Sequence, residues 1–135
     1  MKLNLELIQY INLFEKITRV NVKNCFFHKD NLVFIVSNGQ ISRAIGKKGF
    51  NIKKISRMIN KKIKIAEYND DPVKFINSYV SPIDVDHIEL KDKTINIKAK
   101  NSKDKGLLIG RNGRNLENIK NLINYYFKIE KVRII

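Results

Sequence analysis

A four-residue segment bracketed by glycines occurs twice in this chain and constrains its fold more than any other feature. Residues 46–49 read Gly-Lys-Lys-Gly, and residues 110–113, 64 positions later, read Gly-Arg-Asn-Gly. Over residues 45–65, nine of 21 positions are identical at this offset. Because an internal repeat outweighs what length alone suggests, we interpret the 135 residues as two domains, 1–69 and 70–135. Domains of this size bury little surface alone, so we expect them to pack together.

Hydrophobic periodicity predicts the same order of elements in both halves: helix, strand, strand, short helix, glycine loop, helix, strand. In one predicted strand the alternation slips phase between Val85 and Ile88. The expected fold class is α+β. Helices are expected at residues 3–18, 40–45, 50–60, 73–80 and 102–109 and from the second loop to residue 126, and strands at residues 20–28, 31–37, 61–68, 84–90, 94–100 and 128–135.

The loops suit a ligand with a phosphate backbone. Two helices that meet across four residues need a sharp reversal, and glycine tolerates backbone angles that a Cβ makes costly. The missing side chains also let a sugar-phosphate backbone approach the main chain, where the next helix presents free N–H groups. A lone G-x-x-G motif is more often a simple helical turn. The repeated flanking pattern favours a functional loop.

The net charge of +14 favours a polyanionic partner. Residues 31–66 hold nine lysines and arginines and no carboxylate, and residues 1–70 carry +9 of the charge. A basic membrane-binding surface would need an amphipathic helix with lysines opposite an apolar face, a pattern missing from the sequence. No signal peptide or spanning segment is predicted. We therefore expect a soluble, cytoplasmic nucleic-acid-binding protein that does not bind membranes.

Each half resembles a KH domain, whose G-x-x-G loop grips the backbone of about four nucleotides. The leading helix and closing strand resemble the type II form, with the order α-β-β-α-α-β. Two such units with a short linker are similar to the archaeal NusA-like proteins, which are implicated in transcription elongation and termination. The resemblance implies a monomer that binds single-stranded RNA. RNA polymerase is a candidate partner, although the additional domains of bacterial NusA are not expected here.

The resemblance places bases in an apolar groove beside each loop. Positions 44, 45, 52 and 55 and positions 108, 109, 116 and 119 are the groove candidates. The second loop should grip phosphate less strongly, because Asn112 replaces Lys48 and Asp104 and Glu117 lie nearby in the sequence. The residues expected to bind RNA are Gly46, Lys47, Lys48, Gly49, Gly110, Arg111, Asn112, Gly113, Arg43, Ile45, Ile52, Lys53, Ile109, Arg114 and Leu116.

The remaining polar and aromatic residues indicate no catalysis. His28 and His87 lack metal-ligand spacing, and Cys25 alone excludes an intrachain disulfide, so we expect neither metal nor cofactor. A nucleotide-hydrolysing Walker loop would need Gly-Lys followed by serine or threonine. Phe50 either stacks on a base or packs in the core, whereas Tyr126 is expected in the core. A KH-type factor for ribosomal RNA binding or ribosome assembly is the alternative function, and selectivity for RNA over DNA stays open.

Overall fold

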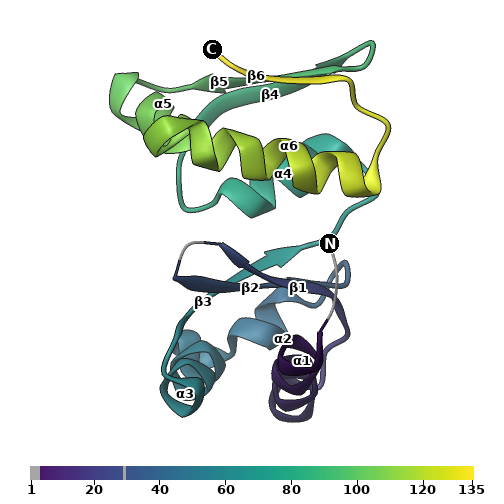
Figure 1. The fold of residues 1–135 in the computed structure, drawn as a ribbon, viewed down its shortest axis with the longest axis vertical. Helices are drawn as coiled ribbons and strands as arrows, with labels where there is room; N and C mark the ends of the chain where they lie inside the picture. Colours follow the sequence, from purple (N-terminus) through teal and green to yellow (C-terminus); the bar gives the residue numbers. More distant parts are fainter. Residues whose placement is uncertain (1–3, 29) are drawn as a thin grey trace. The chain divides into compact units, whose positions relative to one another are not determined.

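The computed structural model describes residues 4–28 and 30–135, which form two compact units, Met1–Asn69 (unit 1) and Asp70–Ile135 (unit 2). Both units are α+β, and each carries its helices on one face of a three-stranded sheet (Figure 1). None of the helices in the described part of the chain is long and apolar enough to cross a bilayer. The expected packing of one half on the other stays a prediction.

Unit 1 follows the order α-β-β-α-α-β. Its sheet has the order β1-β2-β3, in which β1 and β2 are antiparallel and β2 and β3 are parallel. The parallel pair requires a crossover, and the two helices on either side of the first glycine loop supply it. The elements are α1 (Leu5–Thr18), β1 (Val22–His28), β2 (Asn31–Val36), α2 (Ile41–Ile45), α3 (Phe50–Ile59) and β3 (Lys62–Glu67).

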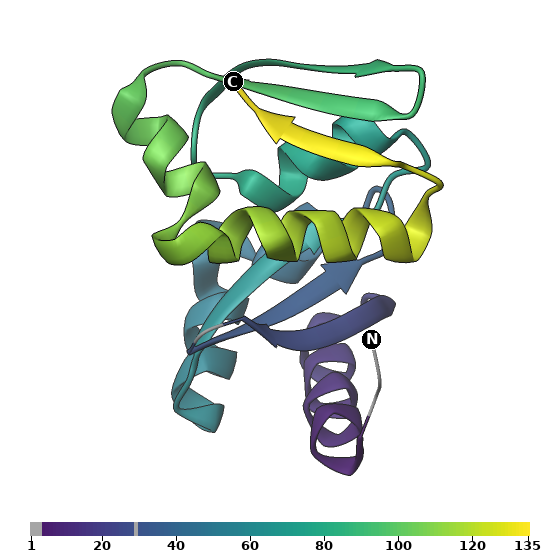
Figure 2. The ribbon, with the colours of Figure 1, turned by 45° about the horizontal axis from the view of Figure 1, so that its top comes forward.

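Unit 2 repeats this topology, and Figure 2 shows its sheet and helices from a second direction. The sheet has the order β4-β5-β6, with an antiparallel pair followed by a parallel pair. The fold class predicted from the sequence, two tandem type II KH domains, is confirmed. The elements are α4 (Pro72–Val80), β4 (Val85–Lys91), β5 (Thr94–Ala99), α5 (Ser102–Ile109), α6 (Arg114–Tyr126) and β6 (Lys131–Ile134).

Helix α1 is specified by its cap and by one apolar face. The side chain of Asn4 accepts a hydrogen bond from the Leu7 N–H at 2.9 Å, which satisfies one free donor of the first turn. Phe14, two turns further on, is fully buried and stacks on Phe34 of β2 with ring centroids 4.1 Å apart. This stack joins the helix to the central strand and so forms part of the core on which α2 and α3 also pack.

Most predicted boundaries agree with the structure to within two residues, and the last strand is the exception. β6 begins at Lys131 and not at residue 128, because residues 127–130 form a connection after the end of α6, where the Phe127 N–H still bonds to the Ile123 carbonyl. The first residue of the predicted N-terminal helix and Lys29 of the predicted β-turn lie outside the described residues.

The phase slip seen in the sequence marks a β-bulge. Pairing between β4 and β5 shifts register between Val85 and His87, and an equivalent shift occurs in β1 between Val22 and Asn24. An extra residue in one strand breaks the inward and outward alternation, which explains the irregular pattern. The bulge is thus a second feature that both units share.

The repeat loses its fixed offset after the third helix of each unit. α3 has 10 residues and α6 has 13, so the closing strands no longer align at 64 positions. In the sheets, Ile63 pairs with Leu32 and Val132 pairs with Ile95. The identities at residues 64–65 and 128–129 therefore do not join equivalent positions, and the 64-residue offset holds only around the loop although the topology repeats throughout.

Candidate nucleic-acid interface

The first glycine loop is a tight turn whose backbone only glycine adopts easily. Gly46 has φ 80° and ψ 167°, and Gly49 has φ 73° and ψ 19°. The N–H of Gly49 donates to the Gly46 carbonyl at 3.0 Å and closes the turn. Between them Lys48 also adopts a left-handed conformation, with φ 53° and ψ 30°. That conformation costs a lysine roughly 1 kcal/mol.

The second loop has nearly the same backbone. Gly110 has φ 76° and ψ 170°, Gly113 has φ 73° and ψ 15°, and the closing hydrogen bond measures 3.1 Å. Here the left-handed tip is Asn112, with φ 56° and ψ 27°. Asparagine tolerates this region better than lysine. Loop 1 therefore keeps a cation at a position where asparagine would be less strained.

The two glycines of each loop are required for different reasons. A Cβ built on Gly46 would lie 2.9 Å from the Asn51 Cγ, and one on Gly110 would lie 2.9 Å from the Asn115 Cγ. A Cβ on Gly49 would meet only the Lys53 Cε at 3.8 Å, and one on Gly113 would meet nothing within 4 Å. The first glycine is thus packed against the helix, whereas the second leaves the main chain open to a ligand.

An asparagine after each loop ties the two helices together. The Asn51 Nδ2 donates to the Arg43 carbonyl at 3.0 Å, and the Asn115 Nδ2 donates to the Leu107 carbonyl at 2.7 Å. Both carbonyls belong to the last turn of the preceding helix, where carbonyls lack helical partners. Sequence reasoning assigned these asparagines no role, although their identity in both copies was a signal. These hydrogen bonds stabilise the conformation of each turn.

The cations of loop 1 are exposed and available to an external anion. Within the described residues, neither Lys47 nor Lys48 forms an ion pair. The flanking Lys53 is exposed as well, and the Arg43 Nη1 donates to the Arg19 carbonyl at 3.4 Å. In unit 2 the corresponding polar positions, residues 111, 112 and 114, are likewise exposed. All predicted polar site residues therefore surround the two turns.

The helices that follow the loops begin without a side-chain cap. Gly49 precedes α3 and Gly113 precedes α6, and neither position supplies a side-chain hydrogen bond to the first turn. Uncapped N–H groups and the positive end of the helix dipole favour an anion at this point. With the exposed cations, they give each turn the electrostatics of a phosphate site.

The apolar groove candidates separate into two groups. Ile45, Ile52, Ile109 and Leu116 are half-buried and retain exposed surface beside the loops. The side chains at positions 44, 55, 108 and 119 are buried and belong to the cores. Only the first group can contact a base without rearrangement, so the expectation for the four buried positions is corrected.

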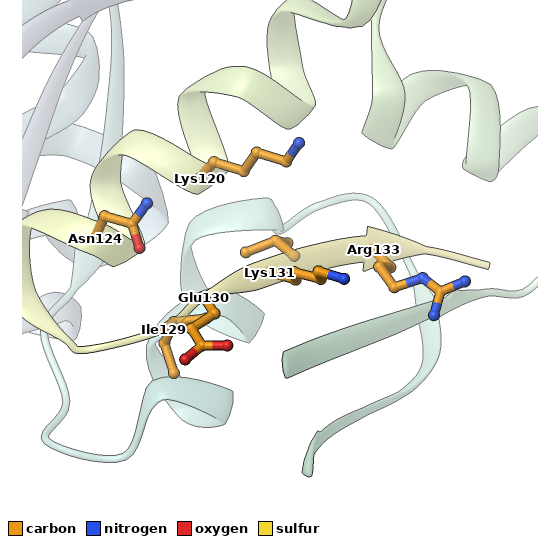
Figure 3. A pocket seen from close by; sticks show the side chains of 7 residues that line it. Lys120, Asn124, Ile129, Glu130, Lys131 and Arg133 are labelled. Atoms are coloured by element: carbon orange, nitrogen blue, oxygen red, sulfur yellow. The ribbon is translucent and has the colours of Figure 1, made fainter. Parts of the chain in front are cut away.

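A cavity of about 570 Å³ lies between α6 and β6 (Figure 3). Lys120 and Asn124 line it from the helix, and Lys131 and Arg133 line it from the edge strand. Glu130 is the carboxylate at its rim, where it lies 3.9 Å from the Lys93 Nζ. Sequence reasoning missed this group, since its members come from a helix and a strand that only the three-dimensional packing brings together.

The aromatic candidates differ in their surroundings. Phe50, the first residue of α3, is 62% exposed, which excludes core packing for its ring. Tyr126 packs edge-on against Phe75 of α4, with ring centroids 5.5 Å apart, whereas Tyr125 is exposed. Phe50, which directly follows loop 1, therefore remains a candidate for ligand contact.

The single thiol and one of the histidines have different surroundings. Cys25 is buried in the core of unit 1, where burial raises the pKa of its thiol to about 12. The His87 Nδ1 lies 3.2 Å from the Asp86 Oδ2 on the exposed face of β4. Within the described residues, no group of three or more histidine, cysteine or carboxylate side chains is placed to hold a metal ion.

Comparisons with known proteins agree with this architecture. A model of the NusA-like second KH domain matches residues 12–71. The whole chain is 35% identical to the probable transcription termination protein NusA of Methanocaldococcus jannaschii, covering 75% of it, and 30% identical to that of Methanococcus vannielii, covering 80%. The crystal structure of APE1850 matches 98% of this chain and all of its own, with a TM-score of 0.72 and 29% identity. The chain therefore belongs to the archaeal NusA-like family of proteins with two tandem KH domains.

Proposed function

We propose that this protein binds single-stranded RNA through its two glycine loops and acts, without catalysis, as a NusA-like factor in transcription elongation and termination. The observation that carries the proposal is the shared loop geometry, in which an open glycine, an uncapped helix start and exposed cations converge. The relatives named as probable transcription termination proteins support the transcriptional role.

Each loop would hold one stretch of RNA backbone. A phosphate oxygen approaches the main chain at the second glycine, Gly49 or Gly113, where no Cβ obstructs it. Lys47 and Lys48 add formal charge at the first loop, and Arg111 adds it at the second. Arg43, Lys53 and Arg114 then flank the backbone, and bases rest on the half-buried aliphatic side chains next to the turns, which are Ile45, Ile52, Ile109 and Leu116.

Unit 2 has a further basic surface to support its less charged loop. The cavity between α6 and β6 presents Lys120, Lys131 and Arg133 together with the amide of Asn124. An RNA strand that leaves the second loop along α6 would meet these donors. Linking two RNA-binding units in one chain also makes the second contact effectively intramolecular, which raises the overall affinity.

A charge-reversal titration tests the proposed site. Lys47→Asp combined with Lys48→Asp should weaken binding of a labelled single-stranded oligoribonucleotide by at least tenfold, because two phosphate contacts become repulsive. Lys91→Asp with Lys128→Asp is the matched control, since both lysines are exposed residues of unit 2, are not among the residues proposed to bind RNA and change the net charge equally. Equal losses in the two variants would show that only net charge matters and would remove loop 1 from the site.

The salt dependence gives an independent measure. Single-strand affinity falls with a log-log slope of about 0.7 per neutralised phosphate, so the loop variant should lose roughly 1.4 from the slope. A slope near zero for the unaltered protein would contradict phosphate binding. Recovery of RNA polymerase, rather than ribosomal subunits, with the tagged protein would separate the transcriptional role from the ribosomal alternative.

A further inference from the structure

We propose that Phe50 is a base-stacking platform, so that the nucleotide next to the phosphate held by loop 1 lays its base on the Phe50 ring. The inference rests on the proposed RNA binding and adds a contact that the loop itself does not supply. Its ligand class is an unpaired nucleobase attached to a phosphate backbone.

Exposure of the ring is the first observation. Phe50 is 62% exposed although it directly follows Gly49 at the start of a helix, with helical φ −56° and ψ −45°. Among the described residues, its ring has no aromatic or cation–π partner. A single exposed hydrophobic residue is ordinary on protein surfaces. The neighbours of Phe50 are what distinguish it.

Those neighbours form a depression of about 520 Å³ lined by Lys47, Lys48, Phe50 and Lys53. One aromatic ring and three lysine side chains line it, and none of the four lining residues is a carboxylate. An occupant that suits it must offer a flat apolar surface and negative charge within a few ångströms. Every nucleotide of a single strand has both, and an aromatic ring accepts any base face because each base has a π surface.

Unit 2 provides an internal contrast at the equivalent position. Arg114 follows the second loop where Phe50 follows the first, and it too is the first residue of its helix. A guanidinium adds a further cation there but no aromatic surface. Loop 1 would therefore contact both the phosphate and a neighbouring base, whereas loop 2 would act mainly on the backbone.

Two probes separate stacking from charge. Phe50→Ala should weaken binding of a ten-nucleotide oligoadenylate by about five- to a hundredfold, the range expected for one lost base stack. It should leave binding of inorganic polyphosphate unchanged, because that chain has charge but no bases. Phe50→Trp and Phe50→Tyr should retain oligoadenylate affinity, and Phe50→Leu should not. The salt slope of Phe50→Ala should equal that of the unaltered protein, since no charge is lost.

A fluorescence readout checks the contact directly. The chain contains no tryptophan, so Phe50→Trp introduces a single reporter whose emission should be quenched by oligoadenylate and not by polyphosphate. Leu90→Trp, at an exposed site on β4, is the matched control and should show no quenching.

The outcomes distinguish this inference from the proposed function. If Phe50→Ala binds oligoadenylate normally while the Lys47 and Lys48 double variant does not, stacking is wrong and RNA binding stands. The stacking proposal is also wrong if Phe50→Ala loses polyphosphate binding as strongly as oligoadenylate binding. The same holds if Phe50→Leu binds oligoadenylate as tightly as the unaltered protein. If Phe50→Ala loses a protein partner but no RNA, the ring is a protein contact. If the unaltered protein binds no RNA, both proposals fail.

Discussion

The two glycine loops share one backbone and differ in the side chains on it. The φ angles of the flanking glycines are positive and differ by at most 4° between equivalent positions of the two loops, and in each loop an asparagine amide bonds to the preceding helix. The tips differ, because loop 1 has Lys48 and Phe50 where loop 2 has Asn112 and Arg114. A few buried or constrained positions thus determine the turn, while the exposed positions are free to set what each loop binds.

The residues around the two loops differ as well. Loop 2 has Asp104 and Glu117 nearby in sequence, a longer following helix and the basic cavity along β6. Loop 1 lies in a segment without carboxylates and has an exposed aromatic ring. We infer that unit 1 relies on its loop and unit 2 on a wider surface. Variants that alter the shared backbone should affect both units alike, and variants at the tips should not.

Alanine at the first glycine should have the largest effect. Gly46 combines φ 80° and ψ 167°, a region nearly restricted to glycine, with the close approach of Asn51. Gly46→Ala should lower the free energy of unfolding by about 3 kcal/mol, and Gly110→Ala by a similar amount. Gly49→Ala, in the more tolerant left-handed region with open space, should cost about 1 kcal/mol. Urea denaturation measures these differences, and equal losses at Gly46 and Gly49 would contradict the packing argument.

Removing the amide donor behind the loop should have the next largest effect. Asn51→Asp places a carboxylate against the Arg43 carbonyl and should cost about 2 kcal/mol of stability at neutral pH. Because only the protonated acid can donate to that carbonyl, its folded pKa is expected above the unfolded value. The loss should therefore shrink as the pH falls from the folded pKa to the unfolded pKa and change no further below it.

Asn121→Asp, at an exposed position on α6, is the control for the added charge. Asn115→Asp should behave like Asn51→Asp, since the same hydrogen bond exists in unit 2. Chemical denaturation at pH 7 and pH 4 provides the comparison. A penalty at Asn51 that does not change with pH would mean that the hydrogen bond is not its cause.

The sequence predicted the shared features better than the differing ones. Glycines at residues 46, 49, 110 and 113 are local signals, since few residue types adopt the angles of such a turn. The order of helices and strands is also a local signal, because it follows from the spacing of apolar residues along the chain. The cavity along β6 could not be found this way, because only the packing of α6 against β6 brings its lining residues together. The burial of the four groove candidates at positions 44, 55, 108 and 119 could not be predicted either, because it depends on three-dimensional packing.

Exchanging the residues at the loop tips, Lys48 and Asn112, should have smaller effects. These effects should have opposite signs for stability and for RNA affinity. Lys48→Asn should stabilise unit 1 by roughly 0.5–1 kcal/mol, because asparagine tolerates the left-handed conformation better. It should also weaken RNA binding and reduce the salt slope by about 0.7, since one phosphate contact is lost. Asn112→Lys should do the reverse in unit 2. A Lys48→Asn variant that is neither more stable nor weaker in binding would show that the tip carries neither strain nor ligand.

The smallest predicted effect is the pH dependence of stability caused by Cys25. This residue lies in β1, where it pairs with Phe34. In the first strand of unit 2, Ile88 of β4 pairs with Ile97 instead. Burial raises the pKa of the Cys25 thiol from 9.0 to about 12, so the unfolded chain loses this proton first as the pH rises. The stability that the neutral thiol provides is complete below pH 9 and declines between pH 9 and 12. By pH 9.5 the unaltered protein should have lost about 0.8 kcal/mol that Cys25→Val keeps. If urea denaturation at pH 8 and pH 9.5 gives the same difference between the two proteins, Cys25 is not the titrating group. A folded protein whose thiol reacts at once with a disulfide reagent at pH 8 would show that the thiol is not buried.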